Sequence, residues 1–257
     1  MCATCGCGND TGTRVTVPHE HPHHHDHVHP HSHEHTHEHP HSHGGETITL
    51  EQRVLAKNDR VAEINREWLA ERGVPALNVM SSPGSGKTTL LERTIAAVGS
   101  ERPVAVIEGD QETMLDANRI KAAGCAVVQV NTGAGCHLDA EMVRDALTVL
   151  DPSPHSLLFI ENVGNLVCPA LFDLGEQSKV VVMSVTEGTD KPLKYPHMFA
   201  AADLVIVNKA DLLPYVDFDV ERCTEYARSV NPGLQVMTLS ATTGQGMQQW
   251  YDWIAAR

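Results

Sequence analysis

Apolar and polar positions alternate along residues 73–257 in short blocks that predict strands and helices in turn. Seven apolar runs are typical of buried strands, and they occupy 76–80, 103–108, 125–131, 156–161, 179–186, 203–208 and 235–240. Helical patterns cover 50–72, 87–98, 113–123, 139–150, 217–230 and 246–256, with Asp139 and Asp217 as expected N-caps. This alternation predicts an α/β fold with a doubly wound, mostly parallel sheet.

The loop after the first predicted strand has the composition of a phosphate-binding P-loop, in the strand-loop-helix context that this motif requires. Glycine backbones can close around phosphate oxygens, a lysine neutralises the β/γ charge and a hydroxyl can ligate Mg²⁺. The residues that would do this are Gly84, Ser85, Gly86, Lys87, Thr88 and Thr89. One departure from G-x-x-x-x-G-K-S/T is Ser81, which stands where the first glycine is usual.

A second motif predicts which base is bound. Asn208, Lys209 and Asp211 end the strand 203–208. A carboxylate at Asp211 can accept from guanine N1–H and its exocyclic amine, whereas adenine offers an acceptor at N1 and would leave the charge unpaired. The pair Ser240-Ala241 resembles the loop whose backbone N–H reads guanine O6 in G domains. We therefore expect GTP and GDP as ligands.

The residues that would catalyse GTP hydrolysis are indicated less clearly than those that would bind the nucleotide. Asp110 ends a strand and is the first candidate carboxylate for Mg²⁺, with Glu161 the next. Lys87 and Thr88 complete the expected catalytic set. The sequence shows no clear arginine finger or water-positioning glutamine, so slow intrinsic turnover is expected.

Composition divides the chain near residue 45. Segment 1–45 contains 14 of the 17 histidines, and we expect it to be a metal-binding extension that is disordered without metal, ahead of a nucleotide-binding domain over 46–257. The formal charge of −14 argues against nucleic-acid binding, which needs a basic patch. The apolar runs are too short to span a membrane, and no signal core is recognised, so a cytoplasmic location is expected.

Cysteines and histidines suggest three metal-binding groups. Cys2, Cys5 and Cys7 place three thiols within six residues, and three thiolates leave a fourth position open, suited to Ni(II) if planar or Zn(II) if tetrahedral. Histidines 19–43 are interleaved with Pro, Ser, Thr and Glu, unlike an expression tag, and favour storage of divalent ions. Cys136, His137 and Cys168 follow two further strands and could converge beside the γ-phosphate.

Taken together, these motifs resemble the HypB family of GTPases, which insert nickel during maturation of nickel–iron hydrogenases. The likeness covers nearly the whole chain: the Cys-x-x-Cys-Gly-Cys start, the histidine tract, the P-loop, Cys136-His137, segment 161–169 and 208–211. It implies a nickel site at Cys2, Cys5 and Cys7 and a nickel or zinc site at Cys136, His137 and Cys168. It also implies a homodimer, a HypA-like metallochaperone as partner and a hydrogenase large-subunit precursor as client.

Two alternatives remain open at this point. The urease accessory GTPases of the UreG type have a similar G domain, but are expected to carry a Cys-Pro-His motif, whereas this chain has Cys136-His137 in one loop and Cys168 in another. A chain that chiefly stores nickel or zinc would not need an intact P-loop and base-reading motif.

Overall fold

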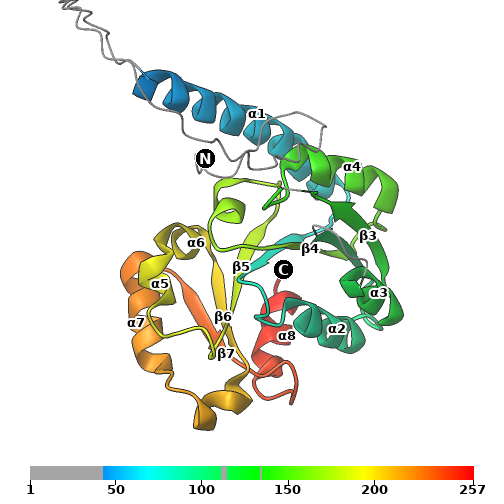
Figure 1. Cartoon of the computed structure of the whole chain (residues 1–257). Helices are drawn as coiled ribbons and strands as arrows, with labels where there is room; N and C mark the ends of the chain where they lie inside the picture. Colours follow the sequence, from blue (N-terminus) through cyan, green and yellow to red (C-terminus); the bar gives the residue numbers. More distant parts are fainter. Residues whose placement is uncertain (1–42, 111–114, 134) are drawn as a thin grey trace, which may run out of the picture. The chain divides into compact units, whose positions relative to one another are not determined.

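The computed structural model describes residues 43–110, 115–133 and 135–257 (Figure 1). The chain divides into two units, residues 1–52 and 53–257, and the sheet and the sites discussed below belong to the second. Cys2, Cys5, Cys7 and most of the histidine tract lie outside the described residues, so the predictions for them stay predictions. In the part of the chain that is described, no helix is both long and apolar enough to cross a membrane.

Seven strands form one sheet with the order β3-β2-β4-β1-β5-β6-β7, and every neighbouring pair is parallel. The strands are β1 Ala76–Ser81, β2 Val104–Asp110, β3 Ala126–Asn131, β4 Leu157–Gly164, β5 Ser178–Ser184, β6 Leu204–Asn208 and β7 Gln235–Thr238. All seven predicted strands are present, and the doubly wound parallel sheet is confirmed. Since β1 lies between β4 and β5, the P-loop that follows it lies near the middle of the sheet edge.

The helices follow the predicted alternation, with two corrections. They are α1 His43–Glu71, α2 Lys87–Val98, α3 Leu115–Ala122, α4 Ala140–Leu150, α5 Lys191–Lys194, α6 Pro196–Ala201, α7 Val220–Val230 and α8 Met247–Ala255, with 3-10 turns η1 Cys168–Leu171 and η2 Ala210–Tyr215. Asp139 caps α4 as predicted, but Asp219, not Asp217, caps α7 by accepting from Arg222 N at 2.9 Å. The intervening Phe218 is buried, and helix α7 starts only after it. Helices α5 and α6 were not predicted because they are too short for a helical period.

Alternate residues of each strand point to opposite faces of the sheet, and both faces are covered by helices (Figure 1). On one face, Leu77 and Val79 belong to a core that includes residues of α2, α3 and α8. On the other face, strand residues such as Ile107 and Ile160 pack with Leu69 of α1 and with α4, while Val181 packs with α6 and α7. The sheet is therefore buried on both sides, and its loop edge remains for ligand binding.

Candidate nucleotide and metal site

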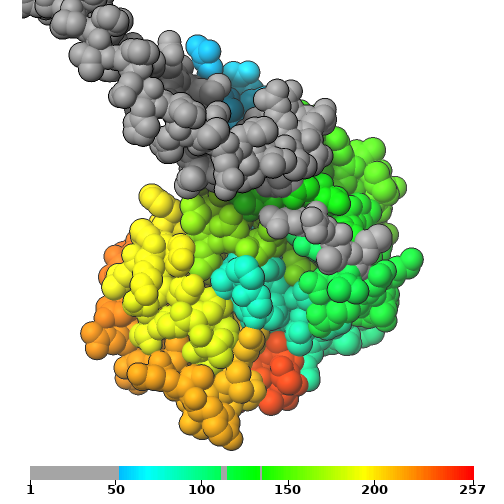
Figure 2. Space-filling model, viewed as in Figure 1, coloured from blue at the N-terminus to red at the C-terminus, as the bar shows by residue number. Residues whose placement is uncertain are grey.

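The P-loop emerges from β1 into helix α2 as the sequence predicts. Gly84 and Gly86 have φ of 73° and 97°, a left-handed conformation that side chains rarely adopt. A Cβ on Gly86 would lie 2.6 Å from Asn208 Nδ2, so this position also needs glycine for space. The Ser85 hydroxyl is buried and has no hydrogen-bond partner among the described residues. In Figure 2 the cyan segment that includes this loop reaches the surface between the green and the yellow-to-orange parts of the chain.

Lys87 and Ser81 contact each other across this loop. Lys87 Nζ donates to Ser81 Oγ at 2.6 Å, and Ser81 Oγ donates to Ser82 O at 2.6 Å. Burial lowers the pKa of Lys87, while the nearby charge of Glu161 opposes that shift. Ser81, which stands where the first glycine of the motif is usual, therefore holds the side chain of Lys87 against the loop.

Two buried carboxyl groups lie beneath the P-loop on adjacent strands. Glu161 Oε1 accepts from Thr88 Oγ1 at 2.9 Å, and Glu108 of β2 is the register partner of Glu161 on β4. Burial raises the pKa of Glu161 to about 7 and that of Glu108 to about 8, the latter also through the charge of Glu161. In each residue, Oε2 is buried without a hydrogen-bond partner in the described part of the chain. Oxygen donors of this kind, together with Thr88, fit a bound Mg²⁺.

The two predicted magnesium carboxylates are placed differently. Glu161, the second choice from sequence, is the one that touches the P-loop hydroxyl of Thr88. Asp110 ends β2 beside Asn131 of β3, at the same sheet edge. Glu108 was not predicted as a functional residue. Its only signal in the sequence is a charged position within an otherwise apolar strand.

The residues predicted to read the base lie beside the P-loop. Asn208 Nδ2 donates to Ser85 O at 2.9 Å, and Lys209 Nζ donates to Gly84 O at 2.7 Å. Asp211 Oδ1 is buried without a partner in the described chain, which leaves an acceptor for a base. Asn208 and Lys209 therefore contact the P-loop directly.

The backbone N–H groups of the predicted guanine-reading loop are already bonded within the protein. Ser240 N donates to Gln245 O at 2.9 Å, and Ala241 N donates to Asn208 Oδ1 at 3.0 Å. Both residues are buried. Their role in reading guanine O6 stays a prediction, and it requires one of these bonds to be shared or exchanged.

The predicted three-ligand metal group is assembled at the same edge. Cys136 Sγ lies 2.9 Å from Cys168 Sγ and 3.5 Å from His137 Nδ1, and one ligand atom from each residue lies within 4.8 Å of the others. All three side chains are half-buried. The ring of His137 stacks on Phe172 at 3.9 Å between centroids, and burial lowers its pKa, which favours the neutral ring that binds metals. Two thiols and one imidazole fit a borderline divalent ion such as Ni(II) or Zn(II).

Asn162 of β4 and Asn165, which directly follows that strand, hold the loop that carries Cys136 and His137. Asn162 Oδ1 accepts from Leu138 N at 3.1 Å, and Asn165 Nδ2 donates to Cys136 O at 3.3 Å. This role cannot be predicted from the sequence, because a side chain that bonds a backbone group leaves no pattern of its own. Cys125 is half-buried and Cys223 is buried, and burial raises the pKa of each thiol to about 11.

Comparison with known proteins identifies the family. Residues 75–238 match the family described as "CobW/HypB/UreG, nucleotide-binding domain". The hydrogenase maturation factor HypB of Escherichia coli (strain K12) is 59% identical over 207 residues, which cover 80% of this chain and 71% of that protein. The probable HypB of Methanocaldococcus jannaschii is 41% identical over 80% of this chain and 94% of its own length.

Solved structures agree with the sequence relatives. The crystal structure of HypB from Archaeoglobus fulgidus has a TM-score of 0.74 and 43% identity, covering 79% of this chain and 98% of that one. HypB from Helicobacter pylori in complex with nickel has a TM-score of 0.73 and 38% identity, covering 78% and 94%. The chain therefore belongs to the HypB family of hydrogenase maturation factors, within the CobW/HypB/UreG group of nucleotide-binding proteins.

Proposed function

We propose that this chain is a nickel metallochaperone that hydrolyses GTP and stores and delivers nickel for hydrogenase maturation. One observation carries the proposal. The end of β4 and the residues after it include both Glu161, which accepts from the P-loop Thr88, and Cys168 of the three-ligand group. Because one short segment contacts both sites, the occupancy of one can alter the geometry of the other.

For the nucleotide, each proposed role follows from an observed position. Backbone groups of residues 84–89 cradle the phosphates, and Lys87 offsets the charge that develops on the β/γ oxygens. Asp211 accepts from the guanine edge. Thr88 and Glu161, with Asp110 close by, would hold Mg²⁺, which supplies charge neutralisation when it is bound with the nucleotide. Slow turnover is expected because no other charged group is assigned to the transition state.

For the metal cargo, the soft donors of Cys136, His137 and Cys168 suit nickel or zinc and leave a coordination position for transfer. The Helicobacter pylori relative was crystallised with nickel, which supports nickel as cargo here. Cys2, Cys5 and Cys7 would form a second, tight site, and the histidine tract would serve as a store. A homodimer, a HypA-like metallochaperone and a hydrogenase large-subunit precursor are the proposed partners, all in the cytoplasm.

Service to urease is a second candidate supported by one relative. A Helicobacter hepaticus protein named "Hydrogenase/urease maturation factor HypB" is 46% identical over 184 residues, covering 70% of this chain and 75% of that protein. Against a UreG-like role, the metal group is split between two loops of this chain, 32 residues apart. A role limited to nickel or zinc storage would leave the P-loop and Asp211 without a purpose.

Complementation tests the proposed function. In cells that make a nickel–iron hydrogenase and lack their own copy of this gene, the chain should restore hydrogenase activity at low nickel. Excess nickel should restore it without the chain, because a delivery factor is bypassed by mass action. Lys87→Ala and Cys168→Ser should each abolish the effect at low nickel, whereas Cys125→Ser, at a half-buried thiol outside the three-ligand group, should not. Full activity with Cys168→Ser would remove this metal group from the delivery route.

A direct measurement tests the proposed coupling. Nickel affinity at Cys136, His137 and Cys168, measured with Cys2, Cys5 and Cys7 replaced by serine, should differ between GDP and a non-hydrolysable GTP analogue. A real coupling is typically ~5–150-fold and reciprocal. Equal constants in the two nucleotide states would leave a structural metal and no switch.

A further inference from the structure

The two chain segments that carry the metal ligands are both held by the same face of helix α1. Cys136 and His137 precede Ala140, the first residue of α4, and Cys168 precedes the loop 172–176. Asn58 and Asn65 are seven residues apart, two turns of α1, so they project from one face of the helix. Both side chains are buried, at 7% and 1% exposed.

Asn58 bridges the two segments with its own amide. Its Oδ1 accepts from Ala140 N at 2.9 Å, and its Nδ2 donates to Asp173 O at 2.7 Å. One hydrogen bond therefore goes to the start of the helix that follows His137, and the other goes to the loop that follows η1. The amide spans the gap between the two halves of the metal group.

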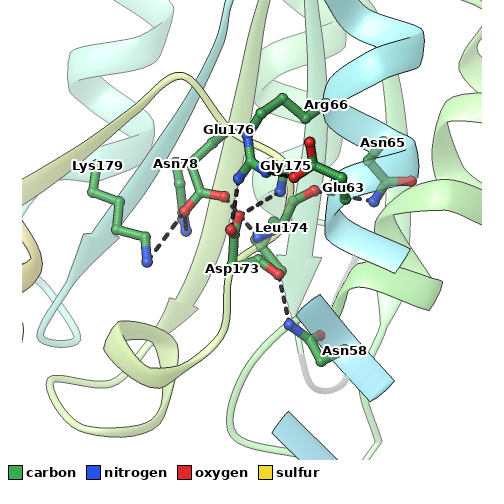
Figure 3. Close-up of polar contacts among 10 residues, drawn as sticks. All are labelled: Asn58, Glu63, Asn65, Arg66, Asn78, Asp173, Leu174, Gly175, Glu176 and Lys179. Atoms are coloured by element: carbon green, nitrogen blue, oxygen red, sulfur yellow. Dashed lines mark hydrogen bonds and ion pairs between the residues drawn. The ribbon is translucent and has the colours of Figure 1, made fainter. Parts of the chain in front are cut away.

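Asn65, two turns further along α1, also bridges the two segments. Its Nδ2 donates to Ala140 O at 2.9 Å and to Leu174 O at 3.0 Å. The N–H and the carbonyl of Ala140 are thus both bonded by asparagines of α1, while Ala140 itself is fully buried against Val61 and Ala62. Figure 3 shows Asn58 and Asn65 reaching from α1 toward the backbone of residues 173–175.

The loop on the Cys168 side is pressed closely onto α1. A Cβ on Gly175 would lie 2.6 Å from Ala62 O and 2.7 Å from the Cβ of Asn65, so only glycine allows this approach. Arg66 Nη2 donates to Asp173 Oδ2 at 2.6 Å, and Asp173 Oδ1 accepts from Gly175 N at 2.8 Å. The loop is therefore tied to α1 both by this close approach and by the contact between Arg66 and Asp173 (Figure 3).

We infer that Asn58 and Asn65 are positioning residues for the Cys136, His137 and Cys168 group, with α1 setting the separation of its two halves. The inference rests on the proposed metal binding. Neither asparagine touches a metal ligand directly. Each holds backbone three to six residues beyond a ligand, on both sides of the group. Its removal should let the two loops separate and raise the free-energy cost of closing them around an ion.

The test uses cobalt(II) as the probe, in the full-length chain with Cys2, Cys5 and Cys7 replaced by serine. Thiolate-to-cobalt charge transfer then reports the internal group, because imidazoles of the histidine tract give no such band. Asn58→Ala and Asn65→Ala should weaken cobalt binding about 10-fold, measured by competition with a chelator. The charge-transfer intensity per bound cobalt should also fall as one thiolate is lost.

Asn231→Ala is the matched control. Asn231 Nδ2 donates to the carbonyls of Phe199, Ala200 and Ala202 at the end of α6, so its removal costs similar hydrogen bonds elsewhere in the fold. This variant should lower the melting temperature and leave the cobalt constant within about 2-fold. If Asn65→Ala does not fold, Asn58→Ala alone carries the test, since its amide contacts both segments.

The possible results distinguish the proposed metal site from the proposed positioning role of the two asparagines. A charge-transfer band that Cys168→Ser abolishes supports the metal group itself. If that band is present and the two α1 variants bind cobalt as tightly as Asn231→Ala does, the positioning role is wrong and the metal site stands. If the parent protein shows no band at all, the proposed metal site fails, and the positioning role fails with it.

Discussion

Replacement of Glu108 by glutamine should stabilise the nucleotide-free protein at alkaline pH and have little effect at acid pH. Glu108 is 2% exposed, and its Oε2 has no hydrogen-bond partner in the described chain. Burial, followed by the charge of Glu161, raises its pKa from 4.5 to about 8. A carboxyl group in this position is therefore neutral in the folded protein at pH values where the unfolded chain has already lost the proton.

The direction in which stability changes with pH follows from proton linkage. Between pH 4.5 and about pH 8 the folded state binds more protons at Glu108 than the unfolded state, so the free energy of unfolding falls as the pH rises. At 1.36 kcal/mol per pKa unit, the loss between pH 5 and pH 8 is at most about 4 kcal/mol. Water near the open sheet edge screens part of this cost, so we expect about 2 kcal/mol. Glutamine cannot ionise and avoids the loss.

The assay is urea denaturation of the nucleotide-free protein at pH 5.0 and pH 8.5, followed by tryptophan fluorescence. The free energy of unfolding of Glu108→Gln should exceed that of the parent by about 2 kcal/mol at pH 8.5. At pH 5.0 the two free energies should agree within about 0.5 kcal/mol. Glu101→Gln, at an exposed turn, is the control and should show no such pH dependence. Comparison of each variant with the parent removes the pH-dependent contributions that the three proteins share. If variant and parent differ in free energy of unfolding by the same amount at both pH values, Glu108 is not a buried carboxyl with a raised pKa.

Three further predictions concern the nucleotide site. Lys87→Ala should leave a folded protein whose GTP turnover falls about 100-fold or more, because charge stabilisation at the γ-phosphate is lost, and single-turnover kinetics will measure it. Asp211→Asn should weaken GTP binding about 100-fold and shift the preference toward xanthine nucleotides, which calorimetric titration can detect; unchanged GTP affinity would remove Asp211 from the base site. Deletion of residues 19–43 should lower the number of nickel ions bound and leave GTP turnover within about 2-fold of the parent. The nucleotide-site contacts described above are made by residues 81–245, so the deletion removes none of them. A large loss of turnover would show that the histidine tract acts on the nucleotide-binding domain.

The sequence predicted that the P-loop and the residues after β6 lie together, because each is a run of consecutive residues at a strand end. A parallel sheet brings all such loops to one edge, so the P-loop and the residues after β6 meet without further information. The same rule brought Cys136 and Cys168 together, since β3 and β4 flank β2 in the sheet. Their convergence was conditional on strand order, which the sequence did not provide.

Other parts of the site depend on contacts that leave no local pattern. The burial of Glu108 follows from its register beside Glu161, and register is not visible in either strand alone. Asn58 and Asn65 read as ordinary polar positions on a helix, yet they bond backbone groups 75 to 115 residues away. The cap of α7 moved to Asp219 because the burial of Phe218 outweighed a local preference that Asp217 satisfies equally well.

The segment that links the two sites has a physical reason to respond to both. Gly164 lies so close to the P-loop that a Cβ on it would come within 3.1 Å of Pro83 Cα, and Glu161 is bonded to Thr88 on the same loop. The P-loop region therefore lies against this segment at two points, and we expect a shift of one to displace the other. Because Asn162 and Asn165 bind the loop of Cys136 and His137 on either side of His137, we expect these hydrogen bonds to carry such a displacement to the proposed metal group. Linkage then requires that whatever factor GTP imposes on nickel affinity, nickel imposes on GTP affinity, so either measurement alone fixes both.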